Sequence, residues 1–166
     1  MAAHLLRKFS NRLPIWMIKF LGSIWMPFLG SGISVLSCSP DYRKIKVVLK
    51  KRWYNSNYVG TAFGGSIFSM TDPFYMLMIM QNLGSEYIVW DKAASIKFIK
   101  PGRTNLYAEF EINEDDISFI KQKLKTEPKL NWEKTVKIYD IHHELISEVK
   151  RTVYIRACTH LTRPPD

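Results

Sequence analysis

The sequence has little cysteine, and it lacks the residue spacings that build metal sites or disulfide scaffolds. Its two cysteines, Cys38 and Cys158, lie far apart in the chain. Two isolated thiols form neither a zinc ligand cluster nor the disulfide framework of a small secreted domain. We therefore expect a reducing compartment, a cytoplasmic protein, and a site that uses neither a metal nor a cofactor.

Long blocks of like charge are also missing, although the net charge is +9. Such a charge fits a polyanionic partner (nucleic acid, an anionic membrane surface or a phosphate-rich ligand such as coenzyme A), or simply a solvated basic surface. The basic residues are scattered, as at 50–52 and 121–125. No zinc knuckle, ribonucleoprotein sequence or helix-turn-helix pattern is present, so we expect no nucleic-acid partner.

An uninterrupted apolar run is absent as well. Residues 13–36, LPIWMIKFLGSIWMPFLGSGISVL, come nearest to one, but a lysine, two prolines and three glycines interrupt them. A spanning helix needs about 20 consecutive apolar residues, and no cleavage site of a signal peptide is obvious. We interpret the segment as one or two short amphipathic helices packed on the domain. The alternative is a peripheral membrane anchor, because Trp16 and Trp25 beside Lys19 suit a headgroup region.

What is present is a globular composition, with 46% apolar and 23% charged residues in a chain of 166, which suits one domain with its own core. Residues 44–53 alternate as a half-exposed strand does. After a loop at 55–65, residues 65–84 are apolar on every side, with Asp72 as their one charge. A helix of this kind is wrapped by other elements, and Gly84 is placed to end it.

The remaining pattern predicts strands and one surface helix. We expect strands at 86–91, 94–100 and 104–112, a helix at 113–125 with an acidic first turn, and a hairpin formed by 132–140 and 146–157. The fold class is therefore α+β, a curved antiparallel sheet of about five strands wrapped around a long central helix. We expect an N-terminal helical extension at 1–39, the sheet domain at 40–158 and a tail at 159–166.

One stretch within this order, NYVGTAFGGSIFSMTD at 57–72, carries a candidate function. Asn57, Gly60, Gly64, Gly65 and Asp72 fall at the spacing of an Asn-x-x-Gly-x-x-His-Gly-Gly motif followed by an aspartate. With the element order, this motif resembles the hotdog fold of the acyl-CoA thioesterase superfamily, and its phenylacetate-degradation-type branch fits best. The resemblance covers roughly residues 40–157. Stretches such as VWDKAASIKFIKPGR at 89–103 look like a subgroup with an extra N-terminal helical segment.

The resemblance implies an acyl-CoA thioester hydrolase. In it the Gly64 N–H polarises the thioester carbonyl, Asp72 acts as general base or nucleophile, and Asn57 positions the water. Further substrate-binding residues are implied around these three. They are Gly65, Phe63, Thr61, Arg103 and Lys100, the last two as contacts for coenzyme A phosphates unless they lie on a solvated turn.

Phe63 departs from the motif, because it stands where the family has histidine. Phenylalanine neither donates nor accepts a hydrogen bond, so any orienting of a carbonyl by that side chain is lost. This difference supports a second hypothesis, a non-catalytic acyl-chain or lipid-binding hotdog protein.

Each candidate group also has a purely structural interpretation. The glycines fit a tight turn, and Asp72 before Pro73 fits the N-cap of a second helical segment. His142 and His143 fit an exposed hairpin turn, since no third metal ligand stands at a recognisable spacing.

The spacing of the motif also bears on assembly. Eight residues separate Gly64 from Asp72, which is ~12 Å along a continuous helix. Two groups that far apart do not reach one thioester, so a site that uses both needs two chains. Exposed edge strands favour pairing as well. We expect a homodimer, with a tetramer as the next assembly, acting on an acyl-CoA or another thioester.

Overall fold

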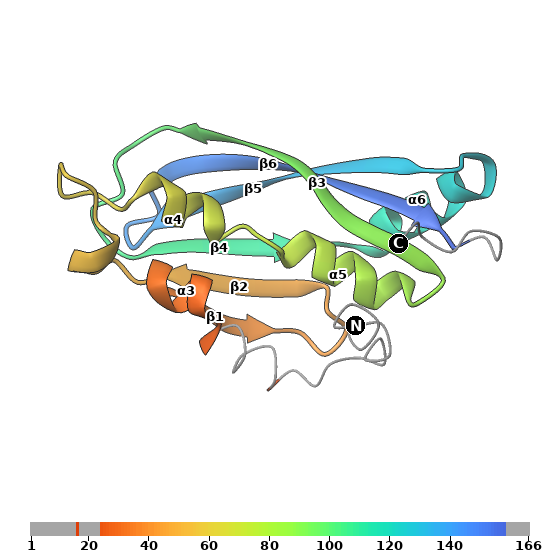
Figure 1. Ribbon diagram of the computed structural model, residues 1–166, viewed down its shortest axis with the longest axis horizontal. Coiled ribbons are helices and arrows are strands. Elements are labelled where there is room, and N and C mark those ends of the chain that lie inside the picture. Colours follow the sequence, from red (N-terminus) through yellow and green to blue (C-terminus); the bar gives the residue numbers. More distant parts are fainter. Residues whose placement is uncertain (1–15, 17–23, 159–166) are drawn as a thin grey trace, which may run out of the picture.

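An antiparallel sheet of six strands forms the frame of the protein (Figure 1). The structure, a computed structural model, describes residue 16 and residues 24–158. The strands are β1 (Ile33–Cys38), β2 (Lys44–Leu49), β3 (Tyr87–Phe98), β4 (Leu106–Glu111), β5 (Leu130–Asp140) and β6 (Leu145–Ala157). Their order in the sheet is β1-β2-β4-β5-β6-β3, so β1 and β3 are its edges.

Four helices and a short 3-10 turn complete the described chain. They are α3 (Met26–Ser31), η1 (Trp53–Asn55), α4 (Gly64–Ser69), α5 (Phe74–Leu83) and α6 (Glu114–Thr126). Figure 1 shows α4 and α5 following one another across one face of the sheet. No helix of the described residues is long and apolar enough to cross a membrane.

The core forms where α5 meets the inner face of the sheet. Phe74 and Tyr75 of α5 pack against Phe110 of β4, with ring centroids 4.9 and 5.2 Å apart, and Tyr75 also meets Trp132 of β5 at 5.6 Å. Met78 lies fully buried one helical turn further on. Offset and edge-to-face ring pairs of this kind add to the free energy gained by burying their area. The apolar composition of the helix is therefore explained by its burial.

The helix on the surface follows its sequence signals closely. Asn113 caps α6 and accepts a hydrogen bond from the Asp116 N–H, while the Asp116 carboxylate accepts one from the Asn113 N–H. Three acidic residues occupy the first turn and two lysines the last, which complements the helix dipole. The prediction of a helix at 113–125 is confirmed.

The α+β class and the antiparallel sheet with a helix packed on it are confirmed, whereas Met80 of α5 is exposed and two details of the sheet were predicted wrongly. The sheet has six strands and not about five, because Ile33–Cys38, expected to be helical, pairs with β2. The stretches 86–91 and 94–100, expected as two strands, form one strand, β3, with a bulge between Asp91 and Ala93. A bulge keeps a strand paired across an irregular residue, and periodicity alone misreads it as a break.

The central helix is not the single long helix predicted at 65–84, and the alternative of a second helical segment near Pro73 is confirmed. It is two helices, since α4 ends at Ser69 and α5 begins at Phe74. The ~12 Å spacing expected for a continuous helix therefore no longer measures the distance from Gly64 to Asp72. Of the predicted N-terminal helices, α3 is present at Met26–Ser31. The rest of that segment, except Trp16 and residues 24–25, and the tail at 159–166 lie outside the described residues.

Substitution of Gly32, at the end of α3, tests the packing of this helix against Asn55 and the end of β2. Gly32 has φ +74°, and an added Cβ would lie 2.3 Å from Asn55 Nδ2 and 2.7 Å from the Lys50 carbonyl oxygen. Gly32→Ala is expected to lower the free energy of unfolding by about 2 to 4 kcal/mol. Gly30→Ala is the matched control, because nothing lies within 4 Å of its added Cβ, and it should stay within about 1 kcal/mol, on the stabilising side. Urea unfolding of both variants measures the difference, and equal midpoints would contradict the prediction.

Candidate functional site

The loop before α4 is a turn held by its own side chains. The Asn57 Nδ2 donates to Thr61 Oγ1 at 2.8 Å, and the Thr61 N–H donates to Asn57 Oδ1 at 3.0 Å. The backbone closes the same turn, since the Asn57 N–H donates to the Thr61 carbonyl and Gly60 takes φ +78°. Asn57 and Thr61 thus lie together, and both polar atoms of the Asn57 amide are engaged.

A buried asparagine ties this loop to the rest of the domain. Asn55 Nδ2 donates to the backbone carbonyls of Ser31 and Lys50, both at 2.9 Å. The backbone carbonyl oxygen of Asn55 accepts from the Phe63 N–H. On the other side, the Ala62 N–H donates to the Gly102 carbonyl at 2.8 Å. Asn55 was not predicted as a site residue, because its single signal in the sequence is its place in an Asn-rich loop.

The two glycines begin α4. Among the described residues, nothing accepts a hydrogen bond from the amide N–H of Gly64 or Gly65, as is usual for the first turn of a helix. An added Cβ on Gly64 would lie 3.0 Å from the Phe98 ring, and one on Gly65 would lie 2.3 Å from the Phe63 ring. The glycines therefore leave two amide donors available and also let two aromatic rings approach the backbone.

Asp72 lies in the break between α4 and α5. The N-cap of α5 is Pro73, without a side-chain cap, so the interpretation of Asp72 as an N-cap is wrong. Its carboxylate instead accepts a hydrogen bond from Arg151 Nη2 at 2.7 Å. About half of the Asp72 side chain is exposed (48%), whereas that of Arg151 is 3% exposed. A buried cation thus holds a carboxylate that solvent and ligands can reach.

A second carboxylate shares this arginine. Asp91 of β3 forms an ion pair with Arg151 Nη2 at 3.1 Å. Neither Asp91 oxygen nor Arg151 Nη1 has a hydrogen bond of good geometry within the described structure, and the Phe68 ring lies 5.7 Å from the guanidinium carbon. Burial raises the pKa of the Asp91 carboxyl, and the charge of Asp72 adds to the rise, while Arg151 opposes it. The cluster therefore holds one arginine between two unlike carboxylates.

Arg151 and Asp91 were not predicted as site residues, although the sequence contains one signal for Arg151. Along β6, Val149, Arg151, Val153 and Ile155 are all buried, which places the arginine at a core-facing position of an alternating strand. A charge at such a position needs a partner. Asp91 gave no comparable signal, because it stands at the bulge where the alternation of β3 fails.

Other predicted residues lie apart from this cluster. Lys100 forms an exposed ion pair with Glu144 at 2.9 Å, and Arg103 is exposed on the adjoining turn. Within the described ranges, no group of three residues could hold a metal ion.

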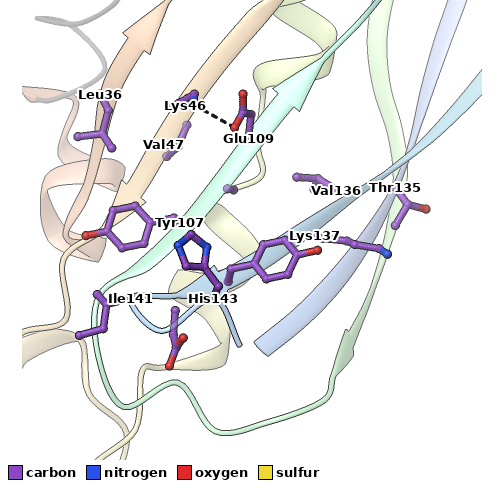
Figure 2. Close-up of a pocket in the computed structure, with 13 residues that line it drawn as sticks. Leu36, Lys46, Val47, Tyr107, Glu109, Thr135, Val136, Lys137, Ile141 and His143 are labelled. Atoms are coloured by element: carbon purple, nitrogen blue, oxygen red, sulfur yellow. Dashed lines mark ion pairs between the residues drawn. The ribbon is translucent and has the colours of Figure 1, made fainter. Parts of the chain in front are cut away.

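The outer face of the sheet carries a hollow of about 590 Å³, which includes none of the predicted site residues. Figure 2 shows Tyr107, Ile141 and His143 among the side chains that line it. Its lining residues come from β1, β2, β4 and β5 and from the hairpin turn after β5.

Comparison with known proteins places this arrangement among related folds. The family model described as a domain of unknown function (DUF4442) matches residues 16–155. No curated protein matches the chain.

Solved structures share the fold at low sequence identity. The chain is similar to the "probable thioesterase" PA5026 from Pseudomonas aeruginosa, with a TM-score of 0.77 at 16% identity over 87% of this chain and 97% of that one. It is similar to thioesterase HI1161 from Haemophilus influenzae, with a TM-score of 0.66 at 13% identity over 92% and 98%. A hypothetical thioesterase from Streptococcus pneumoniae, solved with coenzyme A, gives 0.53 at 16% over 75% and 89%. The hotdog fold is thereby confirmed.

The Asp91 carboxyl gives a prediction for stability against pH. Its pKa is raised in the folded protein, so the folded state holds this proton to a higher pH than the unfolded chain does. Ionisation of Asp91 therefore disfavours the folded state as pH rises above the ordinary carboxyl pKa and through the raised one. Asp91→Asn removes that ionisation, and its stability relative to wild type is expected to grow over this window.

Urea unfolding of wild type and Asp91→Asn between about pH 4 and pH 7 measures the effect. Asp115→Asn is the matched control, since Asp115 is an exposed carboxylate of α6 without an ion pair in the described structure. Parallel curves for wild type and Asp91→Asn would contradict the prediction.

Proposed function

The chain belongs to the DUF4442 family, and we propose that it hydrolyses acyl-CoA thioesters, with Asp72 as general base or nucleophile and the Gly64 N–H as a donor to the oxyanion. The observation that carries the proposal is the Asp72 carboxylate, half-exposed and fixed by the buried guanidinium of Arg151. Two amide donors that no residue of the described chain engages lie at the start of the preceding helix. The hotdog proteins of similar structure support the reaction class.

Hydrolysis by this site needs one proton transfer to the carboxylate. As a general base, Asp72 accepts a proton from a water molecule while the water oxygen bonds to the thioester carbon. The carbonyl oxygen then carries the negative charge, and cleavage of the C–S bond releases the coenzyme A thiolate, which takes up the proton as thiol. The products are the free acid and coenzyme A. Arg151 keeps the carboxylate oriented, as a fixed base requires.

The amide donors of Gly64 and Gly65 suit the oxyanion role for two reasons. They are not engaged by any described residue, and backbone donors need no reorganisation when charge develops on the carbonyl oxygen. Phe63, exposed beside them, supplies an apolar wall in place of the hydrogen bond of a histidine. We infer that Asn57 holds the loop and does not position water, because Thr61 engages both of its amide atoms.

The proposed substrate class rests on coenzyme A thioesters. A similarly folded thioesterase binds coenzyme A, and Arg103, exposed on the turn that hydrogen-bonds to the Ala62 N–H, is placed near the loop that leads to Gly64. We propose Arg103 as a contact for the phosphates. Lys100 is less suited, because Glu144 already neutralises it.

We further propose a homodimer formed through β3. This strand is 12 residues long, and among the described strands it pairs only with β6, while Trp90 and Phe98 expose large apolar side chains along it. A long apolar edge of this kind pairs with another chain unless it is blocked. A second copy beside β3 would place its own residues near Asp91 and Phe98, and hence near both Asp72 and Gly64. A tetramer would need a further surface.

Substitution of Asp72 tests the catalytic role. Asp72→Asn and Asp72→Ala are expected to lower the rate of acyl-CoA hydrolysis at least a hundredfold, measured by release of the thiol from short, aromatic and long acyl-CoAs. Asp115→Asn is the matched control and should keep the wild-type rate. Unfolding curves separate loss of chemistry from loss of fold, since Arg151 keeps Asp91 as a partner when Asp72 is replaced.

A wild type that is inert on the whole panel, or a variant as fast as wild type, would remove the catalytic role. Native mass spectrometry then distinguishes the second function, a binder of acyl chains without turnover, which the phenylalanine at 63 favours. Acyl species that co-purify with an inert protein support the binder, and their absence rejects it.

Mixing two inactive variants tests the shared site. Asp72→Ala removes the carboxylate, and Gly64→Pro removes the amide donor at the first position of α4, where proline suits a helix start. If each site takes one group from each chain, heterodimers regain one intact site of two, so an equal mixture should show about a quarter of the wild-type activity. Heterodimers confirmed by native mass spectrometry that show no activity would reject the shared site.

A further inference from the structure

One end of the molecule exposes several large apolar side chains. Trp53 is 88% exposed, Tyr58 is fully exposed, and Tyr54 and Val59 are exposed as well. These four residues, here called the aromatic tip, come from η1 and the Asn57–Thr61 turn, between β2 and α4. In Figure 1 this segment projects beyond the sheet at the end where α4 lies.

The exposed surface continues onto α3. Asn55 of η1 donates to the carbonyl of Ser31 at the end of α3, so the two elements are fixed together. Along α3, Met26 and Leu29 are exposed. Contiguous exposed apolar surface is uncommon on a monomeric soluble protein and marks a site of interaction. Tryptophan and tyrosine in particular favour the interface of a membrane with water.

The charge of the chain is concentrated in the same part of the sequence. Residues 1–71 contain ten lysines or arginines and a single acidic residue, Asp41, and so carry the whole net charge of +9. Residues 72–166 contain fourteen basic and fourteen acidic residues. The aromatic tip thus belongs to a segment almost free of acidic side chains. The net charge of the chain arises from this segment and not from an even spread of basic residues along the sequence.

The cations next to the tip are not neutralised by ion pairs. Lys50, Lys51 and Arg52 directly precede η1, and none of them forms an ion pair with a carboxylate of the described residues. Lys44 and Lys46 on β2, by contrast, pair with glutamates of β4 at 2.9 and 3.1 Å. Uncompensated cations beside exposed aromatic rings match the chemistry of an anionic membrane surface, which attracts basic residues and accepts ring insertion.

We propose that this end of the molecule docks on an anionic phospholipid surface, with the aromatic tip among the headgroups and residues 50–52 against the lipid phosphates. A second copy is a poorer occupant, because a symmetric contact would bring the same cations face to face. Nucleic acid is poorer too, since the aliphatic side chains of Val59, Met26 and Leu29 would find no apolar surface there. The proposal does not depend on catalysis.

Sedimentation with vesicles tests the proposal on the full chain. Wild type is expected to bind phosphatidylcholine vesicles that contain about a third phosphatidylserine, and not phosphatidylcholine alone. Lys50→Gln, Lys51→Gln and Arg52→Gln together should weaken that binding about a hundredfold. The matched control replaces three exposed lysines, Lys121, Lys125 and Lys129, with glutamine and should weaken it far less.

The rings are tested separately. Trp53→Ser with Tyr58→Ser should weaken binding at least tenfold, whereas Phe119→Ser, which removes an exposed aromatic ring of α6, should leave it unchanged. Absence of binding to anionic vesicles would overturn the proposal, as would tip and control variants that bind alike. Light scattering adds a further outcome: if the tip variants dissociate an oligomer, the tip is a contact between copies and the proposal is wrong.

Discussion

The buried guanidinium of Arg151 is the interaction on which the candidate site depends. It joins Asp72, in the break between two helices, to Asp91 on the edge strand β3. Two carboxylates around one buried cation leave a net negative charge, and burying charge is unfavourable unless each group is paired. Because Asp72 remains half-exposed, the pairing fixes a carboxylate without withdrawing it from solvent. The same contact couples the path of the central helices to the edge of the sheet.

The start of α4 combines a packing role and a chemical one. The glycines allow Phe98 and Phe63 to lie against the backbone, and no described residue accepts a hydrogen bond from their amide groups, because they occupy the first turn of a helix. A residue with a side chain would obstruct both the rings and any ligand carbonyl. The Asn57–Thr61 turn, closed by its own hydrogen bonds, fixes the direction from which the chain enters this helix. Structural and functional requirements therefore coincide in one short segment.

The segment from residue 53 to residue 72 begins at the surface and ends at the buried arginine. Its beginning, with Trp53 and Tyr58, is exposed and lies next to cations that form no ion pair with a described carboxylate, whereas its end, with Asp72, reaches the buried arginine. A protein that takes its acyl substrate from a lipid surface would benefit from this arrangement, since one continuous stretch would link surface and site. Because the net positive charge lies in residues 1–71, an anionic surface would attract the end of the molecule that carries the aromatic tip.

The sequence predicts the α+β class, an apolar helix packed on the sheet, the surface helix with its acidic first turn and the hotdog resemblance, because each rests on local periodicity, charge pattern or motif spacing. The break before Phe74 was already open from Asp72 and Pro73, which fit the start of a second helical segment. The sequence did not reveal that β1 is a strand or that 87–98 is one bulged strand. Those features depend on pairing with distant residues, which periodicity does not record. The candidate site, too, was predicted only in part from the sequence. Motif spacing predicted Asp72 and Gly64 as site residues. The pairing of Asp72 with Arg151, 79 residues away in the chain, follows only from the tertiary structure, because an ion pair depends on proximity in space and not in sequence.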